Sequence, residues 1–229
     1  MAMNGRQPER TCVILPMKSF TLAKSRLRDG LSDHARAALA RAMFERAVRA
    51  AAECQRVDDT YVVTNGDDVA ESVRALNDAR IRVLRDPQPN MPLAGLMDWA
   101  LGEVATRAAT RALILMADLP RLETRDVEEL CSALDSSDCV LVSDQRGQST
   151  NALGMRLPFR GGTSFGQPDS FALHTQRMQA LGLRTWHASN ARVAHDVDIP
   201  EDLNMALGPL ALPGASFISD AAASKGHGC

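Results

Sequence analysis

Five short apolar runs recur along the chain, and the segments between them carry apolar residues at helical spacing. The runs cover residues 11–16, 60–64, 81–84, 111–118 and 139–144 and are rich in Val, Ile and Leu. Short runs of this kind, without alternating polar positions, are typical of strands buried on both faces. The pattern therefore predicts a sheet with a helical layer on each side.

The segment between the first two runs predicts a long helix over residues 32–54, with Ser32 as a suitable N-cap. One face of this helix carries an apolar stripe formed by Leu39, Met43, Ala47 and Ala51. Shorter helices are predicted over 66–78, 93–109 and 124–135. This β-α-β-α order predicts an α/β fold with a mostly parallel sheet and helices on both faces.

Residues 150–195 break the alternation. They contain two short strand candidates, a Gly-rich turn and one helix around 169–182, and we interpret them as a hairpin or lobe that covers one edge of the sheet. No repeat or linker divides the chain. We therefore expect one domain over 11–208, preceded by a flexible segment (1–10) and followed by a partly disordered tail (209–229).

Composition narrows the function classes. Of 229 residues, 45% are hydrophobic and 24% charged, and the formal net charge is −2, so the chain as a whole does not attract nucleic acid or an anionic membrane. No apolar run reaches the length of a membrane span, and the N-terminus lacks the apolar core of a signal peptide. We expect a cytoplasmic protein with neither nucleic acid nor membrane as partner.

The cysteines argue against a disulfide framework and against a zinc site. There are five of them, an odd number, and none forms a C-x-x-C pair. We expect reduced, mostly buried thiols, apart from Cys229 in the tail. The five histidines show no metal-ligand spacing and are interpreted as packing, surface or tail residues.

In open α/β sheets a ligand lies beyond the carboxyl ends of the strands. The first segment expected at this rim is the loop after the first strand, which contains Lys18, Lys24, Arg26 and Arg28 with no acid before Asp29. Such a loop can wrap linked phosphates through charge-assisted hydrogen bonds. The alternative is an ordinary solvated surface loop. A Walker loop is excluded because its glycines are missing.

Three acids are expected at the same rim. Asp118 follows an apolar run and precedes Leu119-Pro120, while Asp196 and Asp198 are two residues apart and so share one side of an extended segment. Together they form a hard oxygen site suited to Mg²⁺. The alternatives are local: Asp118 begins a turn or caps the helix near 124, although Thr124 is the better N-cap, and Asp198 caps the helix that Pro200 begins.

Two polar loops complete the rim. Ser149, Thr150 and Asn151 follow Gly147, and Ser170 stands near a helix start after Gly166. These groups can donate to a phosphate, and the alternative for each is an ordinary polar turn. No Ser/His/Asp or Cys/His arrangement is visible. Transfer between phosphates does not need one, because the nucleophile is already ionised.

Five segments in this order resemble one family. They are "LPMKSFTLAKSRL", "ADLP", "GQSTNAL", "FGQPDSF" and "DVDIPEDL", and they resemble the phospholactate guanylyltransferase family of deazaflavin coenzyme biosynthesis from about Cys12 to Leu207. The resemblance implies a Rossmann-related, glycosyltransferase-A-like nucleotidyltransferase fold. It also implies transfer of GMP from GTP to 2-phospho-L-lactate, phosphoenolpyruvate or 3-phosphoglycerate, with release of pyrophosphate.

The same resemblance implies residue roles. Asp118, Asp196 and Asp198 would hold Mg²⁺, residues matching Thr150, Gly166 and Ser170 would bind the acid, and the Lys-rich loop would face the triphosphate. The catalytic residues expected in this loop are Lys18, Lys24 and Arg26, which with Mg²⁺ would stabilise the charge that develops on pyrophosphate. Two rival functions stay open: a nucleotidyltransferase with a sugar-phosphate or molybdopterin acceptor, and a non-catalytic nucleotide-binding module that regulates a partner. A homodimer would be in keeping with the fold.

Overall fold

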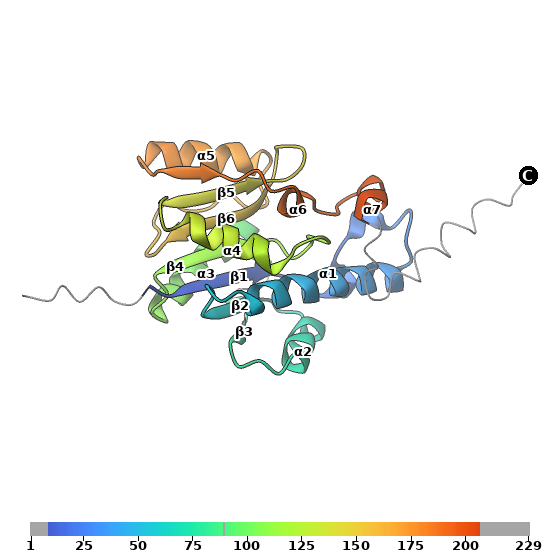
Figure 1. Ribbon diagram of the computed structural model, residues 1–229. Coiled ribbons are helices and arrows are strands. Elements are labelled where there is room, and N and C mark those ends of the chain that lie inside the picture. Colours follow the sequence, from blue (N-terminus) through green and yellow to red (C-terminus); the bar gives the residue numbers. More distant parts are fainter. Residues whose placement is uncertain (1–8, 89, 207–229) are drawn as a thin grey trace, which may run out of the picture.

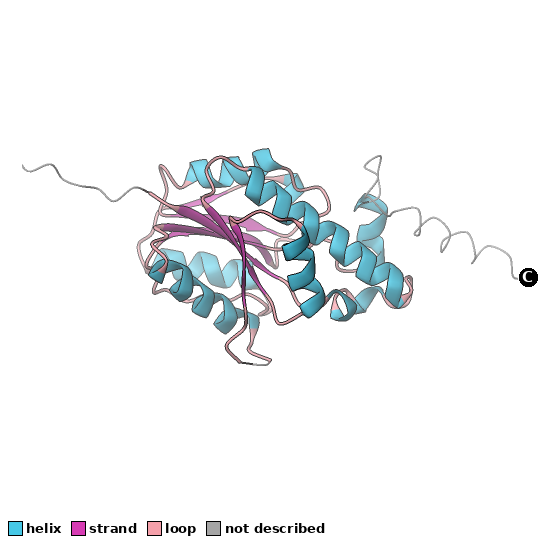
Figure 2. Ribbon diagram, turned by 90° about the horizontal axis from the view of Figure 1, so that it is seen from below, coloured by secondary structure: helices cyan, strands magenta, loops and turns pink. Residues whose placement is uncertain are grey.

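A seven-stranded mixed sheet runs through the middle of the structure, between two layers of helices (Figures 1 and 2). The computed structural model describes residues 9–88 and 90–206. The tail expected over 209–229, with Cys229, and most of the N-terminal segment expected over 1–10 lie outside the described residues. Cys12, Cys54, Cys131 and Cys139 are free and buried, as predicted.

The sheet has the strand order β3-β2-β1-β4-β6-β5-β7. Its strands are β1 (Thr11–Pro16), β2 (Asp59–Val63), β3 (Ile81–Leu84), β4 (Arg111–Leu115), β5 (Cys139–Ser143), β6 (Thr150–Arg156) and β7 (Thr185–His187). The first four are parallel neighbours, and β7 runs parallel to β5. Each of the five apolar runs forms a strand, so the predicted mostly parallel α/β fold is confirmed.

Helices cover both faces of this sheet. They are α1 (Asp33–Glu53), α2 (Asp67–Ala75), α3 (Leu93–Thr106), α4 (Thr124–Ala133), α5 (Ser170–Ala180), α6 (Ala191–Ala194) and α7 (Pro200–Ala206). The first core cluster joins α1, α2 and α4 to one face, and the second joins α3 and α5 to the other. The predicted stripe on α1 is buried along its whole length. Among the described residues, no helix is long and apolar enough to cross a membrane.

The two predicted helix starts have different outcomes. The Ser32 side chain caps α1 by accepting from the Ala35 amide at 3.2 Å, as expected. Thr124 does not cap α4. Glu123 is the N-cap, in a capping box in which the Asp126 carboxylate accepts from the Glu123 amide at 2.9 Å. With Glu123 as N-cap the residue at N3 is Asp126, whose carboxylate completes the box, whereas with Thr124 as N-cap it would be Val127, which has no acceptor.

The interpretation of residues 150–195 as an edge-covering lobe is wrong for its first strand. β6 lies between β4 and β5, antiparallel to both, and only β7 is at the edge. Six of the seven β6 residues are buried, so the strand completes the core instead of lying over it. Because β6 is antiparallel, its first residues reach the rim where β1 and β4 end.

The pairing of β5 with the beginning of β6 contains a β-bulge. Ser143 pairs with Thr150 and Val142 with Ala152, which leaves Asn151 without a partner on β5. A bulge re-aims the side chains on either side of it. The side chains of the first residues of β6 therefore do not have to alternate strictly between the two faces of the sheet.

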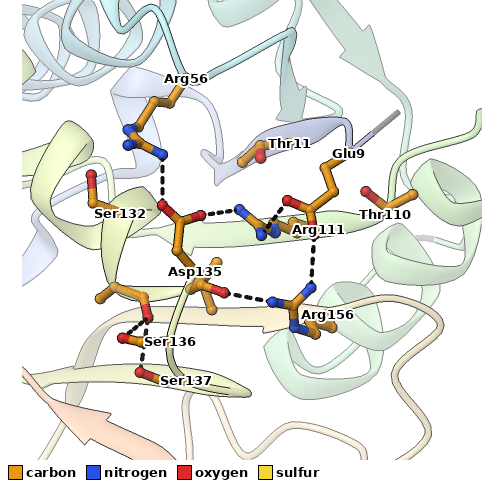
Figure 3. A network of polar contacts seen from close by, with 12 residues as sticks. Glu9, Thr11, Arg56, Thr110, Arg111, Ser132, Asp135, Ser136, Ser137 and Arg156 are labelled. Atoms are coloured by element: carbon orange, nitrogen blue, oxygen red, sulfur yellow. Dashed lines mark hydrogen bonds and ion pairs between the residues drawn. The ribbon is translucent and has the colours of Figure 1, made fainter. Parts of the chain in front are cut away.

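The opposite end of the sheet is closed by an ionic network (Figure 3). The buried Arg111 side chain at the start of β4 donates to Asp135 at 2.7 Å and pairs with Glu9. Arg156, the last residue of β6, binds Glu9 at 3.1 Å and the Leu134 carbonyl at 2.8 Å. These contacts tie β4, β6 and the end of α4 together, and each carboxylate of the network is paired with two arginines.

Candidate active site

Three carboxylates meet at the rim. Asp118 follows β4, and Asp196 and Asp198 lie between α6 and α7. One oxygen of each lies within 4.8 Å of those of the other two. The acids therefore converge despite their separation in the sequence, as the rim argument predicted. Whether they bind a metal stays a prediction.

Lys24 supplies a cation to these acids. Its Nζ lies 2.5 Å from Asp118 Oδ2 and 3.1 Å from Asp198 Oδ1, and its side chain is only 9% exposed. Burial disfavours the charged ammonium, but attraction to Asp118 and Asp198 outweighs this and raises the pKa of Lys24. Arg26 adds a weaker contact from an exposed position, with Nη1 3.4 Å from Asp198 Oδ2. The predicted basic loop is therefore part of the acid cluster.

Lys24 and Arg26 do not satisfy all the carboxylate oxygens of the acid cluster. Asp118 Oδ1 is buried and accepts no hydrogen bond from the described residues. Burial, followed by repulsion from Asp118 and Asp198, raises the pKa of Asp196 to about 6. An unpaired carboxylate oxygen beside a carboxyl that resists ionisation is the environment a divalent cation would relieve. All the donors are hard oxygens, which fit Mg²⁺.

The basic loop is fixed by an arginine that the sequence reading did not consider. Two short 3-10 turns, Phe20–Leu22 and Ser25–Leu27, flank Lys24, whose φ of 54° is left-handed. Arg36 of α1, only 1% exposed, donates to the Ala23 carbonyl at 2.7 Å. The sequence does contain a signal for this role, because Arg36 lies three residues before Leu39 and so falls on the apolar stripe of α1. A charged side chain on a buried face must be paired.

Asn151 holds the acid-bearing segment instead of facing a ligand. Its amide nitrogen donates to the carbonyls of Val193 and Ala194 at 3.0 and 3.2 Å and lies 3.4 Å from Asp196 Oδ1. An amide nitrogen has two hydrogens, so these contacts use its donor capacity. The expectation that Asn151 donates to the substrate is therefore replaced by an anchoring role.

A second anchor fixes the same segment from α4. Asp126 is fully buried, accepts from Asn190 at 2.9 Å and receives Arg192 Nη2 at 2.5 Å. Burial raises the pKa of Asp126, but the hydrogen bonds from Arg192 and Asn190 outweigh it and hold that pKa below its usual value. The chain immediately before Asp196 is thus attached to the helical layer.

Asp198 makes no hydrogen bond to an α7 amide among the described residues. Asp202, in the first turn of α7, accepts from the amides of Asp198 and Ile199 at 2.9 and 3.0 Å. Arg146, in the turn before β6, binds the other oxygen of Asp202 at 2.7 Å. The Asp198 side chain remains available for cations, and Figure 1 shows α7 next to the segment that follows β1.

A hydroxyl cluster lies on the other side of Asn151. The Thr150 amide donates to Ser170 Oγ at 3.0 Å, and Thr150 Oγ1 lies 2.8 Å from His174 Nδ1. Two of the predicted substrate residues, far apart in the sequence, are therefore in contact. His174 of α5 is fully buried. The sequence did not predict its contact with Thr150, because the histidines show no metal-ligand spacing and were interpreted as packing, surface or tail residues.

The remaining predicted residues lie at the surface. Gly166 has a φ of +77°, and a Cβ there would lie 3.2 Å from Leu93 Cβ, so only glycine fits without strain. Ser149 is exposed and contributes backbone groups to the turn closed by Asp144. Lys18 is exposed and makes no ion pair with the described residues. The structure does not bring these three into the hydrogen-bonded clusters.

The sheet order defines a nucleotidyltransferase-type fold, with the rim acids and the basic loop beyond the ends of its strands. A solved chain from Desulfovibrio desulfuricans G20, described as a nucleotide-diphospho-sugar transferase, superposes with a TM-score of 0.74 at 16% identity, over 94% of this chain and 96% of that one. At this identity the likeness shows the fold alone.

The sequence defines the family more closely. Residues 11–208 match the "Guanylyl transferase CofC like" family, and the chain belongs to it. A phosphoenolpyruvate guanylyltransferase from Conexibacter woesei is 35% identical over 85% of this chain and 86% of the relative. A 3-phospho-D-glycerate guanylyltransferase from Phenylobacterium zucineum is 32% identical over 90% and 94%. A 2-phospho-L-lactate guanylyltransferase from Methanothermobacter thermautotrophicus is 29% identical over 85% and 82%.

Burial of His174 predicts a pH dependence of stability. Burial, with a smaller contribution from Arg177, lowers the pKa of His174 to about 4 from an ordinary value of 6.5. Between these values the unfolded chain binds more protons, so this residue's contribution to stability rises with pH and is lost on acidification. The unfolding free energy of the wild type minus that of His174→Gln should rise by on the order of 1 kcal/mol per pH unit in this window. Urea unfolding from pH 4 to 8 measures it, and a flat difference would contradict the burial argument.

Proposed function

We propose that this protein is a Mg²⁺-dependent guanylyltransferase that joins GMP from GTP to the phosphate of a three-carbon phospho-acid. The observation that carries the proposal is that consecutive residues of β6 contact the two groups: Thr150 binds Ser170, and Asn151 contacts Asp196 of the cluster that also holds Lys24. A site for a cation-bound triphosphate thus adjoins hydroxyl donors for a second anion. The substrate names of the three relatives support phosphoenolpyruvate, 3-phosphoglycerate and 2-phospho-L-lactate as the candidate acids.

The reaction needs positioning more than proton transfer. An oxygen of the acid's phosphate forms a bond to the α-phosphorus of GTP, and the bond from that phosphorus to the bridging oxygen breaks, so pyrophosphate leaves with the electron pair. The attacking oxygen is already ionised, so no general base is required. Lys24 and Arg26 would bind the triphosphate and stabilise the charge that develops on the leaving group.

Asp118, Asp196 and Asp198 would hold the metal. Magnesium, when bound, supplies positive charge to the phosphate oxygens. The chain contributes the anchors that keep these acids together: Asn151 and Asp126 on the 190–196 segment, and Arg36 on the Lys24 loop. These contacts position the acids and Lys24 relative to one another.

The decisive assay measures pyrophosphate release from GTP and Mg²⁺ with each of the three acids in turn. We expect release with at least one acid, and much slower release when ATP replaces GTP. A sugar phosphate and a molybdopterin should be inactive as acceptors. Absence of pyrophosphate with all three acids, or equal turnover of ATP and GTP, would contradict the proposed function.

Asp118→Asn should abolish the effect of Mg²⁺ on activity and on the melting temperature. The substitution keeps the shape of the side chain but removes one of the charges that a cation would neutralise. We expect loss of transfer and loss of the rise in melting temperature that Mg²⁺ with GTP gives the wild type. A thermal shift titration measures it, with Asp67→Asn as control, because Asp67 is an exposed acid on α2. A variant that keeps the full Mg²⁺ shift would exclude Asp118 as a ligand.

Lys24→Met should affect both catalysis and the metal-free protein. Loss of a preorganised cation should lower kcat/KM by on the order of 10²-fold. The same change leaves the acids without their nearest ammonium, so the metal-free melting temperature should fall and added Mg²⁺ should recover it. Lys18→Met is the matched control for stability, because Lys18 is exposed and outside the acid cluster. Equal melting temperatures for both variants would show that Lys24 does not stabilise the acids.

A further inference from the structure

His174 connects the start of β6 to the loop that precedes α5. Its Nδ1 lies 2.8 Å from Thr150 Oγ1 at the start of β6, and its Nε2 accepts from the Ser164 amide at 2.7 Å. The ring is fully buried and packs against Phe165 with centroids 4.9 Å apart. Both ring nitrogens are therefore committed, one to each loop.

These two contacts fix the tautomer of the ring. A backbone amide can only donate, so Nε2 must accept from Ser164 and carries no hydrogen. In a neutral imidazole the hydrogen is then on Nδ1, which donates to Thr150 Oγ1. Burial keeps the ring neutral at physiological pH, so the alternative with two N–H groups does not compete.

The fixed tautomer determines what the Thr150 hydroxyl can do. Its oxygen accepts from His174, and the Ser170 hydroxyl lies 3.5 Å away as a further, longer donor. With its acceptor capacity used, the hydroxyl can interact with a further group only by donating its own hydrogen. Neither of these two contacts takes that hydrogen, and Ser170 Oγ already accepts from the Thr150 amide.

We propose that His174 is a positioning residue of the phospho-acid subsite, which makes the Thr150 hydroxyl an obligate donor to an anionic oxygen of the acid. This inference rests on the proposed function, since it assigns the second substrate to this cluster. Through Ser164, the same ring also fixes the loop that leads to Gly166. A carboxylate or phosphate oxygen suits such a donor, whereas a group that can only donate would be rejected.

Two substitutions separate the two contacts. In His174→Asn the side-chain amide nitrogen can take the place of Nδ1 and donate to Thr150, while Ser164 loses its acceptor. In His174→Gln the side-chain oxygen can take the place of Nε2 and accept from Ser164, while Thr150 loses its donor. The pair therefore tests positioning of the hydroxyl apart from support of the loop.

We expect His174→Gln to raise KM for the acid by about tenfold, the effect of one ordinary hydrogen bond, and to leave KM for GTP unchanged. His174→Asn should keep KM for the acid within about threefold of wild type, with a lower melting temperature from the unsatisfied amide. Thr150→Val should match His174→Gln, and the double variant should be no worse than either single one. Unchanged KM for the acid in His174→Gln, or equal increases in both KM values in both variants, would overturn the proposal.

A measurement on the wild type keeps the inference testable if a variant does not fold. ¹⁵N chemical shifts of labelled histidine distinguish the two neutral tautomers, and we expect His174 to carry its hydrogen on Nδ1. A hydrogen on Nε2 would overturn the proposal.

Failure of the proposed function and failure of the role of His174 give different results. Wild-type protein that releases no pyrophosphate with any of the three acids contradicts the proposed function, whereas active wild type with an unaffected His174→Gln contradicts only the role of His174.

Discussion

Mutual repulsion of three carboxylates is the constraint on which the rest of this site depends. Oxygens of Asp118, Asp196 and Asp198 lie within 4.8 Å of one another, where two full charges repel by about 3 kcal/mol at an effective dielectric constant of about 20. The cluster persists because Lys24 is buried among the acids and because separate anchors hold two of the contributing segments. Arg36 fixes the loop of Lys24, and Asp126 fixes the chain before Asp196.

The anchors share one property: each of them binds groups of the protein itself. Arg36 binds a carbonyl, Asn151 binds two carbonyls and one of the acids, and Asp126 binds Asn190 and Arg192. The site therefore consists of a small set of charges and a larger surrounding set of polar side chains that position them. Such preorganisation is what electrostatic catalysis requires, since donors must be in place before charge develops.

The sequence predicted the parts that depend on local pattern. Apolar runs predicted the strands, the stripe on α1 predicted its buried face, and acids after predicted strands predicted the rim cluster. The direction of β6 was not predictable in this way, because a buried strand has the same pattern whether it runs parallel or antiparallel. The roles of Arg36, Asn151 and His174 depend on partners distant in the sequence, and no single-chain pattern encodes such pairing. Propensity favoured Thr124 as the N-cap of α4, whereas in the structure Glu123 and Asp126 form the capping box.

The bulge at the start of β6 has a consequence for how this site can vary. Thr150 contacts α5, on the face where Met178 and Phe165 pack, whereas Ala152 packs with the opposite core, and Asn151 between them reaches the segment of α6. Asn151, which has no partner on β5, therefore separates Thr150 on the side of α5 from the acid cluster, which it contacts through Asp196. Insertion or deletion of one residue between Asp144 and Asn151 would change which side chain occupies the bulge, so the length of this turn matters as well as its composition.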